Sequence, residues 1–322
     1  MHSQLCKGSL GIVSKLLLIS IGFFSSQSVL ADEGGVPFWM SGQYASMAAV
    51  PSQPGWSLVL MPYIYSGSAD KSKNFQHGQS VNAGLSARES IFLFQLGYSA
   101  EEKILGGQPY VGIGWGPGSN TTTAFASVSS LNTEFNKANS VTGSTDIYPL
   151  ASLAWNKGNN NFMTYVTGDI PVGTYSATSL SSIGIGHAAM DAGGGYTYLN
   201  NTTGLEFSSV VGATYNWMNN QTNYKNGIDS HMDWSLSQFV SQNWQVGIAG
   251  YVYYHLTADS GSGARLGAFK SQVAAIGPQV GYLFNIGKKQ AYINLRAYKE
   301  FWAQNRVEGY AMISTISIPL GK

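Results

Sequence analysis

Hydrophobic and polar side chains alternate along most of the chain, with the period of two that a β-strand produces because successive side chains point to opposite faces. Within the stretch 244–256, large apolar residues such as Trp244 and Val246 hold the even positions. Small or polar residues, beginning with Gln245, hold the odd positions. The same division recurs at 272–284 and 291–302. The pattern predicts strands with one lipid-like face and one face of small or polar side chains.

Turn signals divide the chain into twelve expected strands. They lie at 56–69, 79–98, 106–116, 146–157, 160–170, 188–199, 202–217, 227–240, 242–257, 268–285, 290–303 and 306–320. The connections alternate between short ones, at 99–105, 158–159, 200–201, 241 and 286–289, and long ones, at 70–78, 117–145, 171–187, 218–226 and 258–267. Outer-membrane barrels have short periplasmic turns and long extracellular loops. We therefore predict an all-β fold, a transmembrane antiparallel β-barrel of about 12 strands with both termini in the periplasm.

The N-terminus has the layout of a secretory signal peptide. Lys7 and Lys15 precede an apolar run from Leu16 to Phe24, and small or aliphatic residues lead to a cleavage position after Ala31. The apolar run is about half the roughly 20 residues that a membrane-spanning helix needs. We expect a signal peptide at 1–31, the barrel at 56–322, and an intervening segment at 32–55 that forms either a plug or latch in the lumen or an ordered periplasmic stub.

Composition favours a membrane barrel over a soluble β-protein. Charged residues make up 10% of the chain, against about 25% in an ordinary soluble domain, while aromatic residues reach 13%. A large soluble β-sandwich or closed barrel, the alternative fold, would expose more charge. Tryptophans gather near the expected strand ends, as interfacial girdles require: Trp56, Trp115, Trp155, Trp217, Trp244 and Trp302.

Charge and cysteine content exclude other classes. Removal of the leader takes away two of the 17 basic residues and none of the 16 acidic ones, which leaves 15 against 16. The chain has no polybasic face of the kind that binds nucleic acid. The one cysteine, Cys6, lies in the leader, so the mature chain has no disulfide.

Nine polar residues are expected in the lumen from the alternation. They are Asp169, Asp191, Glu206, Asp229, His231, Asp233, Gln279, Arg296 and Glu300. A lysine or arginine that faces lipid at the bilayer midplane costs about 2 to 4 kcal/mol, so charges persist only inside or near the rims. Two roles are open. The nine form either an ion-paired network that braces the barrel, with Arg296 bound to one or two carboxylates, or a polar constriction that selects what passes.

The sequence gives little support for catalysis. The nearest approach to a catalytic set is His231 with Asp229, Asp233 and Ser235. Acids two residues to either side on one strand face fit a polar lumen better, and a metal site would need a second histidine at ligand spacing. The glycine runs near 112–114 and 193–195 lack the lysine of a phosphate-binding loop. We predict no enzyme activity, no catalytic or metal-binding residue and no cofactor.

Several motifs resemble the family named for the meta-pathway of phenol degradation. They include Gly35-Val36-Pro37-Phe38-Trp39, Gly168-Asp169-Ile170-Pro171-Val172-Gly173, Ala192-Gly193-Gly194-Gly195-Tyr196 and Ile276-Gly277-Pro278-Gln279-Val280-Gly281. The resemblance covers nearly the whole mature chain. It implies a barrel similar in kind to the long-chain fatty-acid transporters, linked with uptake of hydrophobic or aromatic compounds. The chain departs from common barrel-assembly signals at its C-terminus, where an aromatic residue is usual and Lys322 stands instead.

Together these features predict an outer-membrane channel or transporter, porin-like, that admits small hydrophobic or aromatic molecules. The alternative is a structural or surface-interaction barrel with a closed lumen. The expected location is the outer membrane of a Gram-negative cell, after signal-peptide-directed secretion. The expected partners are outer-membrane lipid and lipopolysaccharide, the barrel-insertion machinery and small hydrophobic solutes, with no nucleic acid.

Overall fold

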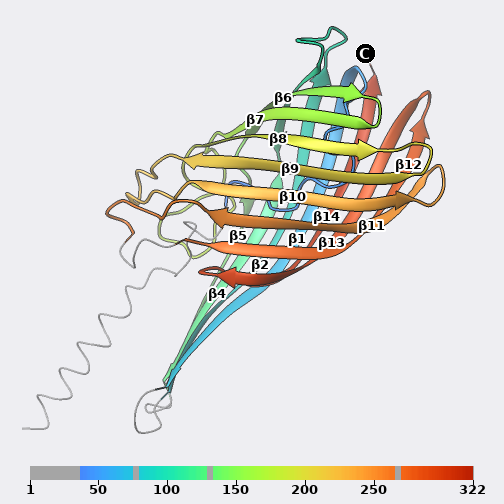
Figure 1. Ribbon diagram of the computed structural model, residues 1–322. Coiled ribbons are helices and arrows are strands. Elements are labelled where there is room, and N and C mark those ends of the chain that lie inside the picture. The colour runs from blue at the N-terminus through green and yellow to red at the C-terminus, as the bar shows by residue number, and fades with distance from the viewer. Residues whose placement is uncertain (1–36, 75–79, 129–132, 265–269, 322) are drawn as a thin grey trace, which may run out of the picture.

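The computed structural model describes residues 37–74, 80–128, 133–264 and 270–321. The expected signal peptide at 1–31 lies outside these residues. The described chain forms a 14-stranded antiparallel sheet (Figure 1). Its strands are β1 (Gly55–Asn74), β2 (Ser80–Ser99), β3 (Gln108–Trp115), β4 (Pro117–Val128), β5 (Thr133–Ser144), β6 (Tyr148–Lys157), β7 (Asn160–Asp169), β8 (Ala189–Leu199), β9 (Leu205–Asn216), β10 (Asp229–Phe239), β11 (Trp244–His255), β12 (Gln272–Ile286), β13 (Lys289–Gln304) and β14 (Glu308–Gly321).

The sheet closes into a barrel because β1 pairs with both β14 and β2. β3 and β4 both pair with β2, each along a different part of it, while β3 also pairs with β6 and β4 with β5. β3 and β4 thus share one position in the wall, and β5 and β6 share the next. The fourteen strands therefore occupy twelve positions, and the predicted barrel of about 12 strands is confirmed.

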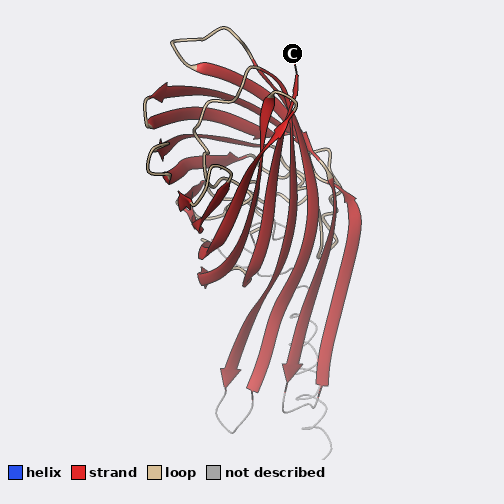
Figure 2. Cartoon of the chain, turned by 90° about the vertical axis from the view of Figure 1, so that its right-hand side faces the viewer, coloured by secondary structure: helices blue, strands red, loops and turns tan. Residues whose placement is uncertain are grey.

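The expected long loop at 117–145 is wrong, because most of it forms β4 and β5. Both strands are rich in Thr, Ser and Asn, so neither face carries the apolar row that marks the other strands. Threonine nevertheless favours extended backbone, since its branched Cβ suits a strand. Together with the 20-residue strands β1 and β2, these two strands extend far beyond the rest of the barrel (Figures 1 and 2).

The two-residue alternation is confirmed in the exposure of the side chains. In β11, Trp244, Val246 and Ile248 are exposed on the outer surface, whereas Gln245 and Ala249 are completely buried. An exposed apolar row and a buried polar row on one strand fit a barrel whose outside faces lipid. Within the described residues, no helix has the length and apolarity needed to cross a membrane.

The wall is irregular where β3 passes into β4 and β5 into β6. Gly116 stands at the first junction, and a Cβ there would collide with the carbonyl oxygen of Phe92. Beyond the junctions, the edge of β5 meets the connection 170–188 instead of β7: Thr174 N donates to Ser144 O over 2.9 Å, and Ser181 Oγ donates to Asn139 O over 2.7 Å. This connection therefore completes the wall beside β5.

Candidate functional site

All nine residues expected in the lumen are buried, each at most 5% exposed. Asp169 and Asp229 lie at the ends of β7 and β10 on the side of the long connections. The other seven lie within strands β8 to β13: Asp191, Glu206, His231, Asp233, Gln279, Arg296 and Glu300. Burial places the nine away from lipid, but their role in selecting solutes stays a prediction.

Residues 37–54, which we call the inner segment, run inside the barrel along strands β8 to β13 (Figure 1). The carboxylate of Asp233 accepts hydrogen bonds from the backbone N–H groups of Gly42, at 2.9 Å, and Tyr44, at 3.1 Å. Glu206 accepts from Met47 N at 3.0 Å. Inward carboxylates thus satisfy the backbone of a segment that has no strand partner of its own. The expected role of this segment as a plug or latch stays a prediction.

Arg296 binds the backbone carbonyl groups of the inner segment, whereas the carboxylates bind its N–H groups. Its Nε donates to Gly42 O over 3.0 Å, and its Nη2 donates to Gln43 O over 2.7 Å. Among the residues that the structure describes, no carboxylate forms the expected ion pair with Arg296. The carbonyl oxygens of the inner segment take the place of the carboxylate, because they point at the guanidinium once the segment lies in the lumen.

Gly42 is required where these contacts converge. Its φ of +81° is one that side chains with a Cβ rarely adopt. A Cβ on Gly42 would also lie 2.8 Å from Tyr298 Cε2 and 2.9 Å from Tyr251 Cδ1. The close approach of backbone to these two rings lets Tyr298 OH donate to Gly42 O over 3.2 Å.

An aromatic and acidic cluster holds the far end of the inner segment. The Trp39 ring stacks on the His231 ring, with centroids 3.5 Å apart and planes 14° apart. His231 Nε2 lies 3.0 Å from Asp191 Oδ2, and Tyr165 OH donates to Asp191 Oδ1 over 2.7 Å. His231 therefore pairs with Asp191, two strands away, and not with the acids beside it in sequence. Burial raises the pKa of the nearby Tyr44 phenol above its usual value, so this ring stays neutral.

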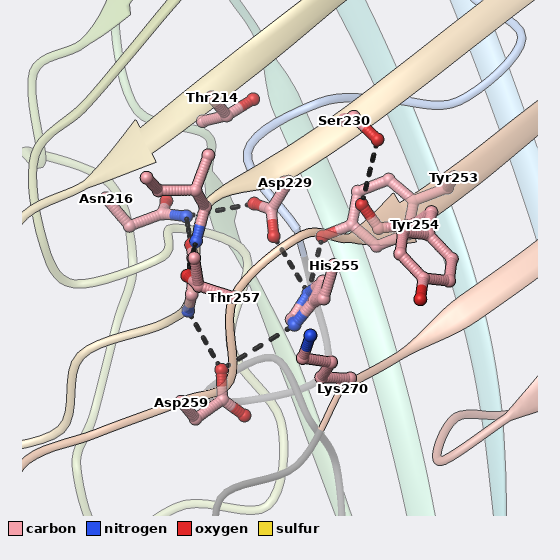
Figure 3. A network of polar contacts seen from close by, with 12 residues as sticks. Thr214, Asn216, Asp229, Ser230, Tyr253, Tyr254, His255, Thr257, Asp259 and Lys270 are labelled. Atoms are coloured by element: carbon pink, nitrogen blue, oxygen red, sulfur yellow. Dashed lines mark hydrogen bonds and ion pairs between the residues drawn. The ribbon is translucent and has the colours of Figure 1, made fainter.

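A second histidine network lies at the end of the barrel that carries the long connections (Figure 3). His255 Nε2 lies 2.9 Å from Asp229 Oδ1, and its Nδ1 lies 3.7 Å from Asp259 Oδ1. Asp259 in turn accepts from Gly227 N at 2.9 Å and from Tyr224 OH at 2.6 Å. The network joins the connections 217–228 and 256–271 to strands β10 and β11. Across the described ranges, no group of three or more His, Cys, Asp or Glu side chains is arranged to hold a metal ion.

A cavity of about 150 Å³ remains between the inner segment and the opposite wall. Strands β1 and β2 contribute mainly apolar and aromatic side chains to it, and Tyr148 and Tyr251 add further rings. The inner segment closes one side with Phe38 and Trp39. Three charged side chains line the cavity: Glu89, Glu300 and Arg306. Uncharged polar side chains such as Gln43, Gln95 and Asn120 also line the cavity, so it is a small, largely aromatic pocket with several polar groups.

Sequence reasoning missed four residues of these networks. Glu89, His255, Asp259 and Arg306 were not among the nine. Glu89 could have been found, since it shares the parity of the inward residues of its strand, such as Leu85 and Ile91. Asp259 and Arg306 lie in connections, where alternation carries no information.

Comparisons with known proteins identify the family and the fold. A family model described as "Putative MetA-pathway of phenol degradation" matches residues 72–315. The crystal structure of an outer membrane channel from Pseudomonas putida F1 is similar with a TM-score of 0.57 at 10% identity, and covers 84% of this chain and 98% of that chain. A FadL homologue from Pseudomonas aeruginosa has a TM-score of 0.39 at 8% identity, over 90% of this chain and 98% of that one. No curated protein matches the chain by sequence.

The likeness to the P. putida structure shows the fold, that of an outer-membrane β-barrel. The family match runs from β1 into β14, and so spans the barrel rather than one motif of it. The resemblance drawn from the sequence motifs is thereby confirmed. The chain belongs to the family described as "Putative MetA-pathway of phenol degradation".

Proposed function

We propose that this protein is an outer-membrane channel that admits small hydrophobic or aromatic molecules. The observation that carries the proposal is the aromatic cavity inside the barrel, between the inner segment and strands β1 and β2. An apolar cavity of about 150 Å³ in a protein core can hold benzene, and this cavity has the same volume. The volume of the cavity is therefore sufficient for a single aromatic ring.

The inner segment sets how solutes pass in this proposal. We propose that it is a plug that narrows the lumen, since its hydrogen bonds to Asp233, Glu206 and Arg296 hold it across the polar side of the barrel. Solutes then travel along the aromatic side. Among the nine lumenal residues, Asp233, Glu206 and Arg296 act mainly by holding the plug, and less as a ring of charges around an open pore.

Location and processing follow from the same proposal. The signal peptide at 1–31 directs secretion and is removed, and the barrel-insertion machinery places the barrel in the outer membrane among lipid and lipopolysaccharide. The exposed apolar rows on the outer face, as in β11, are the surface that lipid would cover.

Uptake into cells tests the proposal. Gram-negative cells with an intact lipopolysaccharide layer, with and without the protein, would be given radiolabelled toluene at low concentration. We expect the initial uptake rate to be several-fold higher with the protein, because lipopolysaccharide slows the entry of apolar solutes. Equal rates in the two strains, with the protein present as a heat-modifiable band in the outer membrane, would contradict channel function.

A structural or surface-interaction barrel with a closed lumen is the second candidate. The observation that favours it is the inner segment itself, whose contacts with Asp233, Glu206 and Arg296 are those of a well-seated element. Planar-bilayer recording, combined with the uptake assay, distinguishes the two candidate functions. The structural role predicts neither conductance nor aromatic uptake, whereas the channel role predicts uptake even where ionic conductance is small.

A further inference from the structure

Two carboxylates line the aromatic cavity, and they differ in the hydrogen bonds that they accept. Glu300 is fully engaged: Tyr65 OH and Gly309 N donate to its Oε2 over 2.8 Å each, and Tyr251 OH donates to its Oε1 over 2.8 Å. Arg306 Nη2 lies 3.9 Å from the same Oε1. Glu300 therefore braces the wall and has little capacity left for a ligand.

Glu89 differs, because its Oε1 is buried and accepts no hydrogen bond from the residues that the structure describes. Its neighbours across the sheet are Tyr65 on β1 and Asn120 on β4. Each of these has a donor that is already engaged elsewhere: Tyr65 OH with Glu300, and Asn120 Nδ2 with Ser182 O at 2.9 Å. Glu89 thus lines the cavity with a carboxylate whose Oε1 has no partner among the described residues, while the adjacent donors are bound to other acceptors.

The surroundings of Glu89 define what could meet this oxygen. Tyr63 and Tyr148 line the same cavity, and the Tyr63 ring stacks on that of Tyr65, with planes 8° apart. These walls suit a flat aromatic ring. With Glu300 matched by Arg306, Glu89 gives the cavity an excess of negative charge whenever its carboxyl group is ionised. An aromatic carboxylate would be repelled, whereas a donor on the ring would have the Glu89 carboxylate as its acceptor.

We propose that Glu89 is the hydrogen-bond acceptor for an aromatic solute that carries a donor, a hydroxyl or an ammonium group. The inference rests on the proposed uptake of aromatic molecules and deepens it, since it assigns the polar contact by which one class of aromatic solute is preferred. A buried polar site rejects an analogue that lacks the matching group far more strongly than an apolar pocket rejects an extra methylene.

Direct binding to the purified protein in detergent tests the assignment, with four probes of similar size. Phenol offers a neutral donor, benzylamine a cationic donor, toluene no donor, and benzoate a negative charge. We expect wild-type protein to bind phenol and benzylamine about tenfold or more tightly than toluene, as befits hydrogen bonds to a charged group, and benzoate most weakly. Calorimetry gives the four affinities.

Two variants of Glu89 separate its chemistry from its shape. Glu89→Leu removes the acceptor, so phenol and benzylamine should fall to the affinity of toluene while toluene is unchanged. Glu89→Gln keeps an oxygen acceptor without the charge, so benzylamine should lose about tenfold or more and phenol less. The conservative variant carries the test if the leucine variant fails to fold. Glu102→Gln, in the exposed turn after β2, is the control for loss of one carboxylate and should change nothing.

The outcomes distinguish this inference from the proposed channel function. Phenol and toluene bound equally by wild type, or weakened equally by Glu89→Leu, would overturn the role of Glu89, even if toluene uptake by cells is intact. Donor-dependent binding that is lost in Glu89→Leu supports that role, even if uptake assays show no transport and the channel function fails. A preference for benzylamine over phenol that disappears in Glu89→Gln identifies the ammonium as the favoured donor.

Discussion

The two sides of the barrel interior share the alternation of inward and outward side chains, but their inward side chains differ in polarity. On strands β8 to β13, inward positions carry polar side chains such as Glu206, Asp233 and Arg296, and these bind the inner segment. On β1 and β2, inward positions carry Met61, Tyr63, Leu85 and similar side chains, and an aromatic cavity remains there. Polar groups that face backbone hold it in place, whereas apolar groups leave room beside it, so one side holds the inner segment and the other receives solute.

Deletion of the inner segment should have the largest effect on the difference between the two sides. A chain without residues 37–54 loses the backbone groups that Asp233, Glu206 and Arg296 now bind. Water would then solvate these charges and the polar side would conduct ions. We expect single-channel conductance in planar bilayers to rise several-fold over wild type. An unchanged conductance in a correctly folded, heat-modifiable barrel would show that the lumen is closed by something other than the inner segment.

Arg296→Ala should have a smaller effect, confined to the polar side. The variant removes hydrogen bonds to Gly42 O and Gln43 O, each of the charge-assisted kind, with a loss of roughly 3 kcal/mol or more. Hydrogen exchange should show faster exchange of the amides of the inner segment, with the barrel strands little affected. Lys299→Ala is the matched control, because Lys299 lies on the exposed face of the same strand and should leave the inner segment protected. Equal protection in both variants would mean that Arg296 does not hold the segment.

Much of the fold could be predicted because alternation reports which face meets lipid. Trp244 and Val246 are exposed and Gln245 is buried, as parity requires. Strands β4 and β5 could not be predicted in this way, because threonine and serine occupy both of their faces and no apolar row exists. A two-residue period is visible only where the two faces of a strand differ in polarity. A strand with two polar faces shows no such period.

The site could be predicted only in part, for a related reason. Parity placed residues such as Asp233 and Arg296 inside the barrel, and the structure places them there. It could not show that Arg296 binds backbone carbonyls instead of a carboxylate, because that partner comes from residues more than two hundred and fifty positions away. The partners of His231 and His255 likewise depend on register between strands and on connections, which a single strand does not encode.

The position of a bound aromatic molecule tests the central claim most directly. Crystals of the protein soaked with bromobenzene would give anomalous density at the bromine. We expect this density in the cavity between Tyr63, Tyr148 and the inner segment, and its loss in Ala87→Leu, where a larger side chain fills the cavity. Density confined to the outer, lipid-facing surface of the barrel, unchanged in Ala87→Leu, would contradict it.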